Sequence, residues 1–183
     1  MTETLTHSEA DLRYPTGRFR RVPSLTSEER QAAIEEIAAT PVRMRAAILG
    51  LTPEQLDTPY RPEGWTVRQL LHHVPDSHVN AYVRFKLALT EDNPTIKTYD
   101  EARWAELEDS RSTPVEVSLD LLEAVHHRWV VLLRSLGPAD FASTFTHPDH
   151  GPMTLDSLLA LYAWHGRHHV AHITGLRQRM GWS

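Results

Sequence analysis

Histidine is the residue type in this sequence that could do chemistry, because twelve are present and most of them are clustered. The densest cluster lies near the C-terminus, where His165 and His169 are four residues apart. On a helix this spacing places two imidazoles one turn apart on the same face, from which both can bind one cation. His168 and His172 have the same spacing, but His168 lies toward one flank of that face, so they rank as the second candidate pair.

The first pair lies on the apolar stripe of a helix predicted over about residues 154–180. On a helical wheel of 100° per residue, six side chains fall within about 80° of one another: Leu158, Tyr162, His165, His169, His172 and Leu176. A stripe of this kind faces the core of a helical bundle, where leucine is the usual residue. Histidines in its middle therefore favour a metal site over ordinary packing.

A third metal ligand has to come from another helix, and the helix predicted over residues 66–90 supplies the best candidate. His73 lies at the edge of its apolar arc, whereas His72 points nearly the opposite way and is expected on the surface. His78 lies within the arc and is expected to be a hydrogen-bonded core histidine. We therefore predict His73, His165 and His169 as the metal ligands.

A helix predicted over about residues 113–136 carries His126 in the middle of its apolar stripe. His126 is a candidate for a fourth ligand, a general base or a hydrogen-bonding partner of a ligand, and a plain buried histidine is an equally simple interpretation. Asp76 is a second candidate proton carrier. The second ring nitrogen of each ligand needs a partner, for which the sequence offers Asp76, Ser77 and Asp156.

A site of this composition would be open rather than closed. Three neutral imidazoles leave one coordination position for water, and an ion held in this way lowers the pKa of that water toward about 7. The sequence contains no cysteine, so a thiolate cannot close the site. These features favour a catalytic or ligand-exchanging metal.

The elements that position these histidines are four long amphipathic segments, over about residues 26–49, 66–90, 113–136 and 154–180. Capping-box sequences begin the first two, and prolines at positions 41 and 75 predict kinks. A short helix is expected over about 98–109, and residues 1–25 read as an extended arm. No alternating strand pattern is found, so we predict an all-α four-helix bundle in one domain over residues 1–183.

Composition excludes several classes of protein. The formal charge of −5 and the scattered basic residues argue against nucleic-acid binding. No apolar run is long enough for a membrane span, and the first residues do not resemble a signal peptide. The absence of cysteine fits a reducing compartment, and we expect a cytoplasmic protein.

Two stretches resemble motifs of the DinB/YfiT-like superfamily. The first spans residues 64–78 and reads Gly-Trp-Thr-Val-Arg-Gln-Leu-Leu-His-His-Val-Pro-Asp-Ser-His; the second spans 164–173 and reads Trp-His-Gly-Arg-His-His-Val-Ala-His-Ile. Shorter similar stretches extend over nearly the whole chain, closest to the YfiT branch of metal-dependent hydrolases. The resemblance implies a four-helix bundle, a homodimer and one Zn or Ni ion per chain, held by His73, His165 and His169.

Three functions stay open on this basis. The first is a metal-dependent hydrolase acting on a small substrate, with His126 or Asp76 as proton carrier. The second is a metal-dependent thiol S-transferase, which would join a low-molecular-weight thiol such as bacillithiol or mycothiol to an electrophile, with Arg84 and Arg167 as candidate contacts of the thiol cofactor. The third is a metal carrier or sensor without enzymatic activity. Trp104 and the arm around residue 14 are candidate contacts of the implied homodimer.

Overall fold

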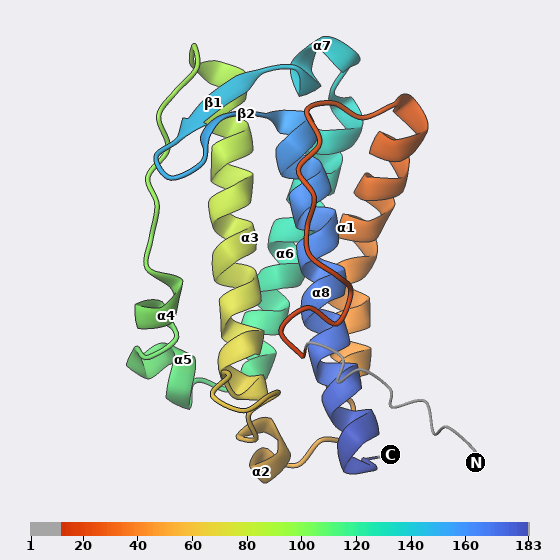
Figure 1. The fold of residues 1–183 in the computed structure, drawn as a ribbon, viewed down its shortest axis with the longest axis vertical. Coiled ribbons are helices and arrows are strands. Elements are labelled where there is room, and N and C mark those ends of the chain that lie inside the picture. Colours follow the sequence, from red (N-terminus) through yellow and green to blue (C-terminus); the bar gives the residue numbers. More distant parts are fainter. Residues whose placement is uncertain (1–11, 183) are drawn as a thin grey trace, which may run out of the picture.

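Four long helices, α1 (Ser27–Ile48), α3 (Val67–Thr90), α6 (Val115–Ser135) and α8 (Leu155–Met180), pack side by side in a computed structural model that describes residues 12–182 (Figure 1). The predicted all-α four-helix bundle is confirmed. Each long helix begins and ends within a few residues of its predicted bounds. None of the helices in the described residues is long and apolar enough to cross a membrane.

The helix starts follow from the capping chemistry in the sequence. The Thr26 side chain accepts a hydrogen bond from the backbone N–H of Glu29, and the Glu29 carboxylate accepts one from the backbone N–H of Thr26. Thr66 and Gln69 form the same reciprocal pair at the start of α3. Such a pair satisfies two backbone donors and fixes where the helix begins. In α3 it thereby sets the rotation of the helix, and with it the direction of His73.

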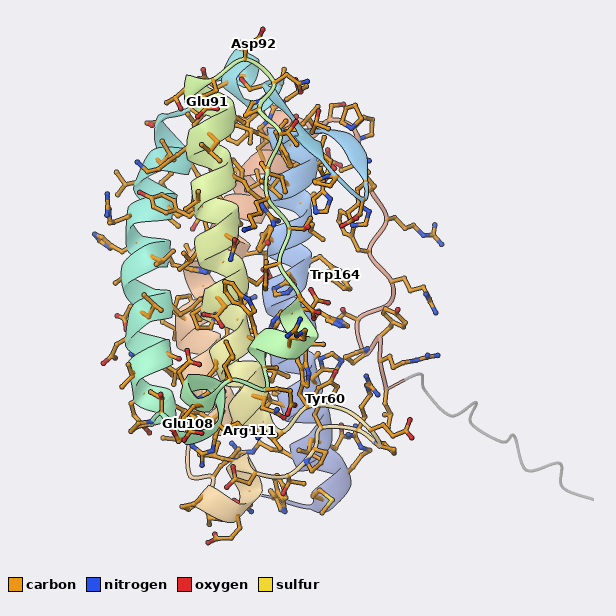
Figure 2. The ribbon with its side chains drawn as sticks, turned by 90° about the vertical axis from the view of Figure 1, so that its left-hand side faces the viewer. Tyr60, Glu91, Asp92, Glu108, Arg111 and Trp164 are labelled. Atoms are coloured by element: carbon orange, nitrogen blue, oxygen red, sulfur yellow. The ribbon has the colours of Figure 1, made fainter. Side chains whose placement is uncertain are left out.

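Four short helices occupy the connections: α2 (Pro53–Leu56), α4 (Glu101–Trp104), α5 (Glu108–Ser112) and α7 (Pro138–Phe141). The pair α4 and α5 replaces the single helix predicted over 98–109. Figure 2 shows α5, with Glu108 and Arg111, at the opposite end of the bundle from Glu91 and Asp92.

The expectation that His72 lies on the surface is wrong. Its side chain is buried, and the Nδ1 atom lies 2.7 Å from the Ser118 hydroxyl. The helical wheel places His72 on the face of α3 that points away from the bundle core. That face is nevertheless covered, because α5 packs against α3.

A two-stranded hairpin closes one end of the bundle, and it corrects the prediction that the chain has no strand. Strands β1 (Thr144–His147) and β2 (Gly151–Thr154) pair antiparallel, with Phe145 opposite Met153. Both of these side chains are buried and cap the core. Each strand has only four residues, which is too short for an alternating pattern to be distinguished from a turn-rich loop.

Inside the bundle, a layer of histidines separates two apolar clusters. One cluster includes Phe85 and Trp129 and lies toward the hairpin, and the other includes Leu70 and Leu122 and lies toward α2. Along three helices, the residues between the clusters include a histidine: His78 on α3, His126 on α6 and His165 on α8. The two clusters hold the helices together, and the layer between them carries the polar groups.

The N-terminal arm runs as irregular backbone along α8 (Figure 1). The Trp164 indole N–H donates to the carbonyl oxygen of Gly17 over 3.1 Å. At the other end of the arm, the buried Asp156 carboxylate accepts from the backbone N–H of Leu25 at 3.0 Å and from the Arg30 guanidinium at 2.7 and 2.8 Å. The arm therefore has a fixed position on α8. The part of the predicted arm before residue 12 lies outside the described residues.

Candidate metal centre

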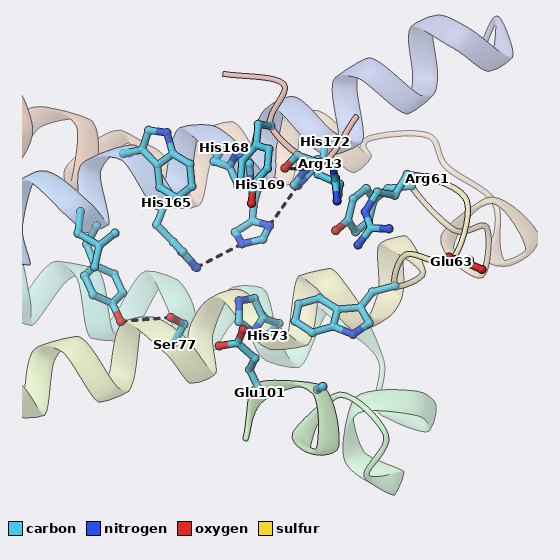
Figure 3. A pocket seen from close by; sticks show the side chains of 17 residues that line it. Arg13, Arg61, Glu63, His73, Ser77, Glu101, His165, His168, His169 and His172 are labelled. Atoms are coloured by element: carbon cyan, nitrogen blue, oxygen red, sulfur yellow. Dashed lines mark hydrogen bonds between the residues drawn. The ribbon is translucent and has the colours of Figure 1, made fainter. Parts of the chain in front are cut away.

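A cavity of about 550 Å³ opens on one side of the histidine layer (Figure 3). Its walls come from segments far apart in the sequence: the arm, the loop before α3, the first half of α3, α4 and the middle of α8. Five tyrosine and tryptophan side chains line it: Tyr14, Tyr60, Trp65, Tyr162 and Trp164. Figure 2 shows Tyr60 and Trp164 on the same side of the bundle.

Three histidines converge at the inner end of this cavity, and they are the three predicted as ligands. One ring nitrogen from each of His73, His165 and His169 lies within 4.8 Å of the others. The Nε2 atoms of His165 and His169 are 3.2 Å apart. Zinc–nitrogen bonds of about 2.0–2.1 Å in a tetrahedral arrangement place two ligand nitrogens roughly 3.3 Å apart. The donor set therefore fits one divalent ion.

Burial keeps these imidazoles neutral, which is the form that binds metal. Desolvation lowers the pKa of His73 to about 4 and the pKa values of His165 and His169 well below their ordinary range. Neighbouring histidines add a smaller effect in the same direction for His165 and His169. A neutral imidazole has one unprotonated nitrogen, whose lone pair can bind a cation.

The second candidate pair has a different arrangement. The ring of His168 stacks on Trp164 with centroids 4.3 Å apart, and it does not belong to the group of converging nitrogens. His172 lies behind His169, with the two Nδ1 atoms 3.4 Å apart. Both rings line the cavity beside the ligand set rather than within it.

The two predicted proton carriers do not lie at the cavity. His126 is 2% exposed, and its ring bonds to His78 and to the carbonyl oxygen of Ile37. Asp76 faces away from the cavity toward α5. There burial, and then the negative charge of Asp109, raise the pKa of Asp76 to about 6. Neither residue is among those that line the cavity.

The other predicted partners of the ligands are also engaged elsewhere. Asp156 pairs with Arg30 near the start of α8. The Ser77 hydroxyl lies at the cavity wall but is 3.2 Å from the Tyr162 hydroxyl. In place of these residues, other histidines contact the predicted ligands: His78 contacts His165, and His172 contacts His169. From the sequence, His78 is expected only as a core residue.

The arginines at the cavity differ from those that the sequence suggested. Arg84 is buried and donates to the carbonyl oxygen of Lys97 over 3.4 Å. Arg167 lies 3.4 Å from the Glu36 carboxylate on the outer face of the bundle. Arg13 and Arg61 line the cavity instead. They come from the arm and from a loop, where no periodic pattern indicates which way a side chain points.

Two carboxylates, Glu63 and Glu101, line the cavity and were not singled out from the sequence. Figure 3 shows Glu101 directed toward His73 and Glu63 turned outward. Glu101 is the first residue of α4, and the chain segment that carries it runs back alongside α3 (Figure 1). This irregular segment brings Glu101 to the cavity, so its position could not be inferred from helical spacing.

A close approach of two helices supports the position of His165. A Cβ atom at Gly166 would lie 2.5 Å from the Thr40 hydroxyl oxygen and 2.9 Å from the Thr40 methyl carbon. We expect Gly166→Ala to push α8 away from α1, to lower the free energy of unfolding by about 1–3 kcal/mol and to weaken metal binding. Urea unfolding and a metal titration measure the two effects.

Gly175→Ala is the matched control in the same helix, because its added Cβ would meet only the flexible Arg179 side chain at 3.4 Å. That change should leave metal binding intact and stabilise the helix by about 0.5–1 kcal/mol. If both alanine variants behave alike, the contact with Thr40 does not position α8.

Known proteins resemble this chain over nearly its whole length. Residues 36–173 match the profile of the DinB superfamily. A protein of Bacillus mycoides (strain KBAB4) and one of Bacillus cereus (strain AH820), both called "Putative metal-dependent hydrolase", are each 57% identical over 172 residues, covering 94% of this chain and 99% of theirs. YfiT from Bacillus subtilis, described as "a probable metal-dependent hydrolase with an unusual four-helix bundle topology", superposes with a TM-score of 0.92 at 47% identity, covering 95% of this chain and 100% of that chain.

Proposed function

We propose that this chain, which belongs to the DinB superfamily, is a hydrolase that uses one divalent ion, zinc or nickel, to cleave a small substrate. The observation that carries this proposal is the convergence of His73, His165 and His169 at the inner end of a cavity. The names of the similar Bacillus proteins support the same reaction class. A donor set of three imidazoles leaves a coordination position for exchange, as a catalytic site requires.

In the proposed reaction the ion would activate water, and the side chains of the protein would hold the ion and orient the substrate. A divalent ion bound here would act as a Lewis acid and lower the pKa of a water molecule toward about 7. The three histidines would hold the ion, and aromatic side chains form part of the cavity wall around it. Arg13 and Arg61 provide positive charge at the cavity wall, where polar groups of a substrate can be oriented.

We further propose that Glu101 accepts the proton from the attacking water, the role that the sequence suggested for His126 or Asp76. Glu101 lines the cavity and points toward His73 in Figure 3. A proton carrier has to reach the reacting group directly or through one water molecule. Among the described residues, Glu101 and Glu63 are the carboxylates that line the cavity, and Glu63 is turned outward.

The test uses metal-loaded protein and a panel of ester, amide and phosphoester substrates. We expect hydrolysis of one class, which stops when a chelator removes the metal. Glu101→Gln should lower turnover by about 10²–10⁴-fold, the range typical of a lost general acid or base, with unchanged metal content. Glu63→Gln is the matched control and should retain activity. Full activity of Glu101→Gln would remove the proposed role of Glu101.

A parallel reaction mixture distinguishes the alternatives. It contains the same protein with a low-molecular-weight thiol and an electrophilic acceptor. Formation of a thioether conjugate without hydrolysis of the panel would replace the hydrolase by a thiol S-transferase. No product in either mixture, together with fast metal exchange, would favour a metal carrier or sensor.

The homodimer stays a prediction from the family resemblance. Trp104 is 39% exposed, which leaves it accessible for a contact between two copies. Tyr14 lines the cavity of its own chain and contacts the ring of His168, so its role within the chain is already visible.

A further inference from the structure

Two chains of hydrogen-bonded histidines lead from the proposed ligands to backbone carbonyl groups. The first runs from His165 through His78 and His126 to the carbonyl oxygen of Ile37. Its three nitrogen–acceptor distances are 3.0, 2.7 and 2.6 Å. The second runs from His169 through His172 to the carbonyl oxygen of Arg13, over 3.4 and 3.3 Å.

The carbonyl at the end of the first chain determines where every proton in it lies. A carbonyl oxygen only accepts hydrogen bonds, so Nδ1 of His126 carries a proton. A neutral imidazole carries one proton, so Nε2 of His126 accepts from Nδ1–H of His78. His78 then accepts at Nε2 from Nδ1–H of His165. The Nε2 atom of His165 is left with a free lone pair.

The second chain leaves the Nε2 atom of His169 unprotonated by the same reasoning. The carbonyl oxygen of Arg13 accepts from Nε2–H of His172, which leaves Nδ1 of His172 unprotonated. This nitrogen accepts from Nδ1–H of His169, so Nε2 of His169 is left with a free lone pair. The two lone pairs face each other across 3.2 Å, at the position where a shared cation would relieve their repulsion.

From this geometry we infer that His78, His126 and His172 are positioning residues that hold His165 and His169 in the tautomer with Nε2 free to bind metal. The inference rests on the proposed metal binding. His78 and His126 are buried with 0% and 2% exposure, so water does not compete for their ring nitrogens. Because each chain ends at a carbonyl oxygen, which cannot release a proton, neither chain conducts protons to the surface.

The two backbone carbonyl groups that end these hydrogen-bonded chains, called the anchors below, come from other parts of the protein than the ligands do. Ile37 belongs to α1 and Arg13 to the N-terminal arm, so neither anchor lies on the helices that carry the ligands. The arm thereby contributes to the metal centre through its backbone, in addition to lining the cavity with the side chain of Arg13.

The direct test is nitrogen-15 NMR of the histidine rings in the metal-free full-length protein at pH 7.5. We expect the Nδ1–H tautomer for His78, His126, His165 and His169, and the Nε2–H tautomer for His172. A predominant Nε2–H tautomer at His165 or His169 would overturn the inference. This measurement needs no substrate, so it stands whether or not the protein proves to be a hydrolase.

A second test removes His126 from the first chain of hydrogen-bonded histidines. His126→Phe should lower zinc affinity by about 10–100-fold, the range for lost partners of metal ligands, and should make His165 a mixture of tautomers. His126→Gln, whose amide both donates and accepts, should restore much of the affinity. Val130→Ala, one turn along α6, controls for loss of core packing and should leave the tautomer of His165 unchanged. Unchanged affinity and unchanged tautomers in His126→Phe would refute the positioning role.

Discussion

Simultaneous replacement of His73, His165 and His169 by alanine is expected to abolish binding of the divalent ion. The three imidazoles are the donors that converge at the cavity, and the sequence has no cysteine that could substitute for them. The wild-type protein should retain about one zinc or nickel ion per chain after dialysis against a weak chelator, and the triple variant should retain almost none. Elemental analysis of matched preparations measures the difference.

The same variant should lose the stabilisation that metal provides. A ligand that binds only the folded state stabilises it by about 4 kcal/mol when present at 1,000 times its dissociation constant. Urea unfolding with and without zinc should show this gain for the wild type and not for the triple variant. His127→Ala is the control, because His127 is exposed on α6 and is not among the residues that line the cavity. Metal retained by the triple variant would place the site elsewhere.

Mild acid is expected to unfold the metal-free protein. Burial lowers the pKa of four histidines to about 4, from an ordinary value of 6.5; they are His73, His126, His168 and His172. Below pH 6.5 the unfolded chain takes up protons that the folded chain excludes. Stability is therefore present above pH 6.5 and is lost as the pH falls toward 4.

The free energy of unfolding is expected to depend strongly on pH because the four histidines with lowered pKa values act together. Each excluded proton contributes about 1.4 kcal/mol per pH unit, so several excluded protons make the free energy of unfolding fall steeply as the pH drops between these values. Urea unfolding at pH 7.5, 6.0 and 5.0 in the presence of a chelator measures the slope. Equal stability at pH 7.5 and 5.0 would mean that the histidines accept protons within the folded protein.

The helices and the convergence of the three histidines could be predicted because both depend on local periodicity. The apolar stripe of α8 has the spacing of a core face, and the two clusters packed around Leu158 and Leu176 show that it is one. A histidine in the middle of that stripe has to point into the bundle. The inward direction of His165 and His169 could therefore be inferred from the sequence alone, and that of His73 from its place at the edge of the arc on α3.

The remaining features depend on connecting segments that lie against the bundle and have no periodic pattern. His72 is buried on the face of α3 against which α5 packs, and Glu101 reaches the cavity because the segment before α4 runs back alongside α3 (Figure 1). The role inferred for His126 depends on whether its ring faces the cavity or another histidine. A helical wheel gives the direction of a side chain but not the identity of the group that it meets.

We propose that His73, His165 and His169 together bind one divalent ion, and X-ray absorption at the metal edge counts the imidazoles bound to that ion. Metal-loaded wild-type protein should show three imidazole ligands at about 2.0–2.1 Å from a single ion. Removing one of the three residues should reduce the number of imidazoles to two. A spectrum without three imidazoles, or one that does not change when His165 is replaced, would show that these three residues do not bind the ion together.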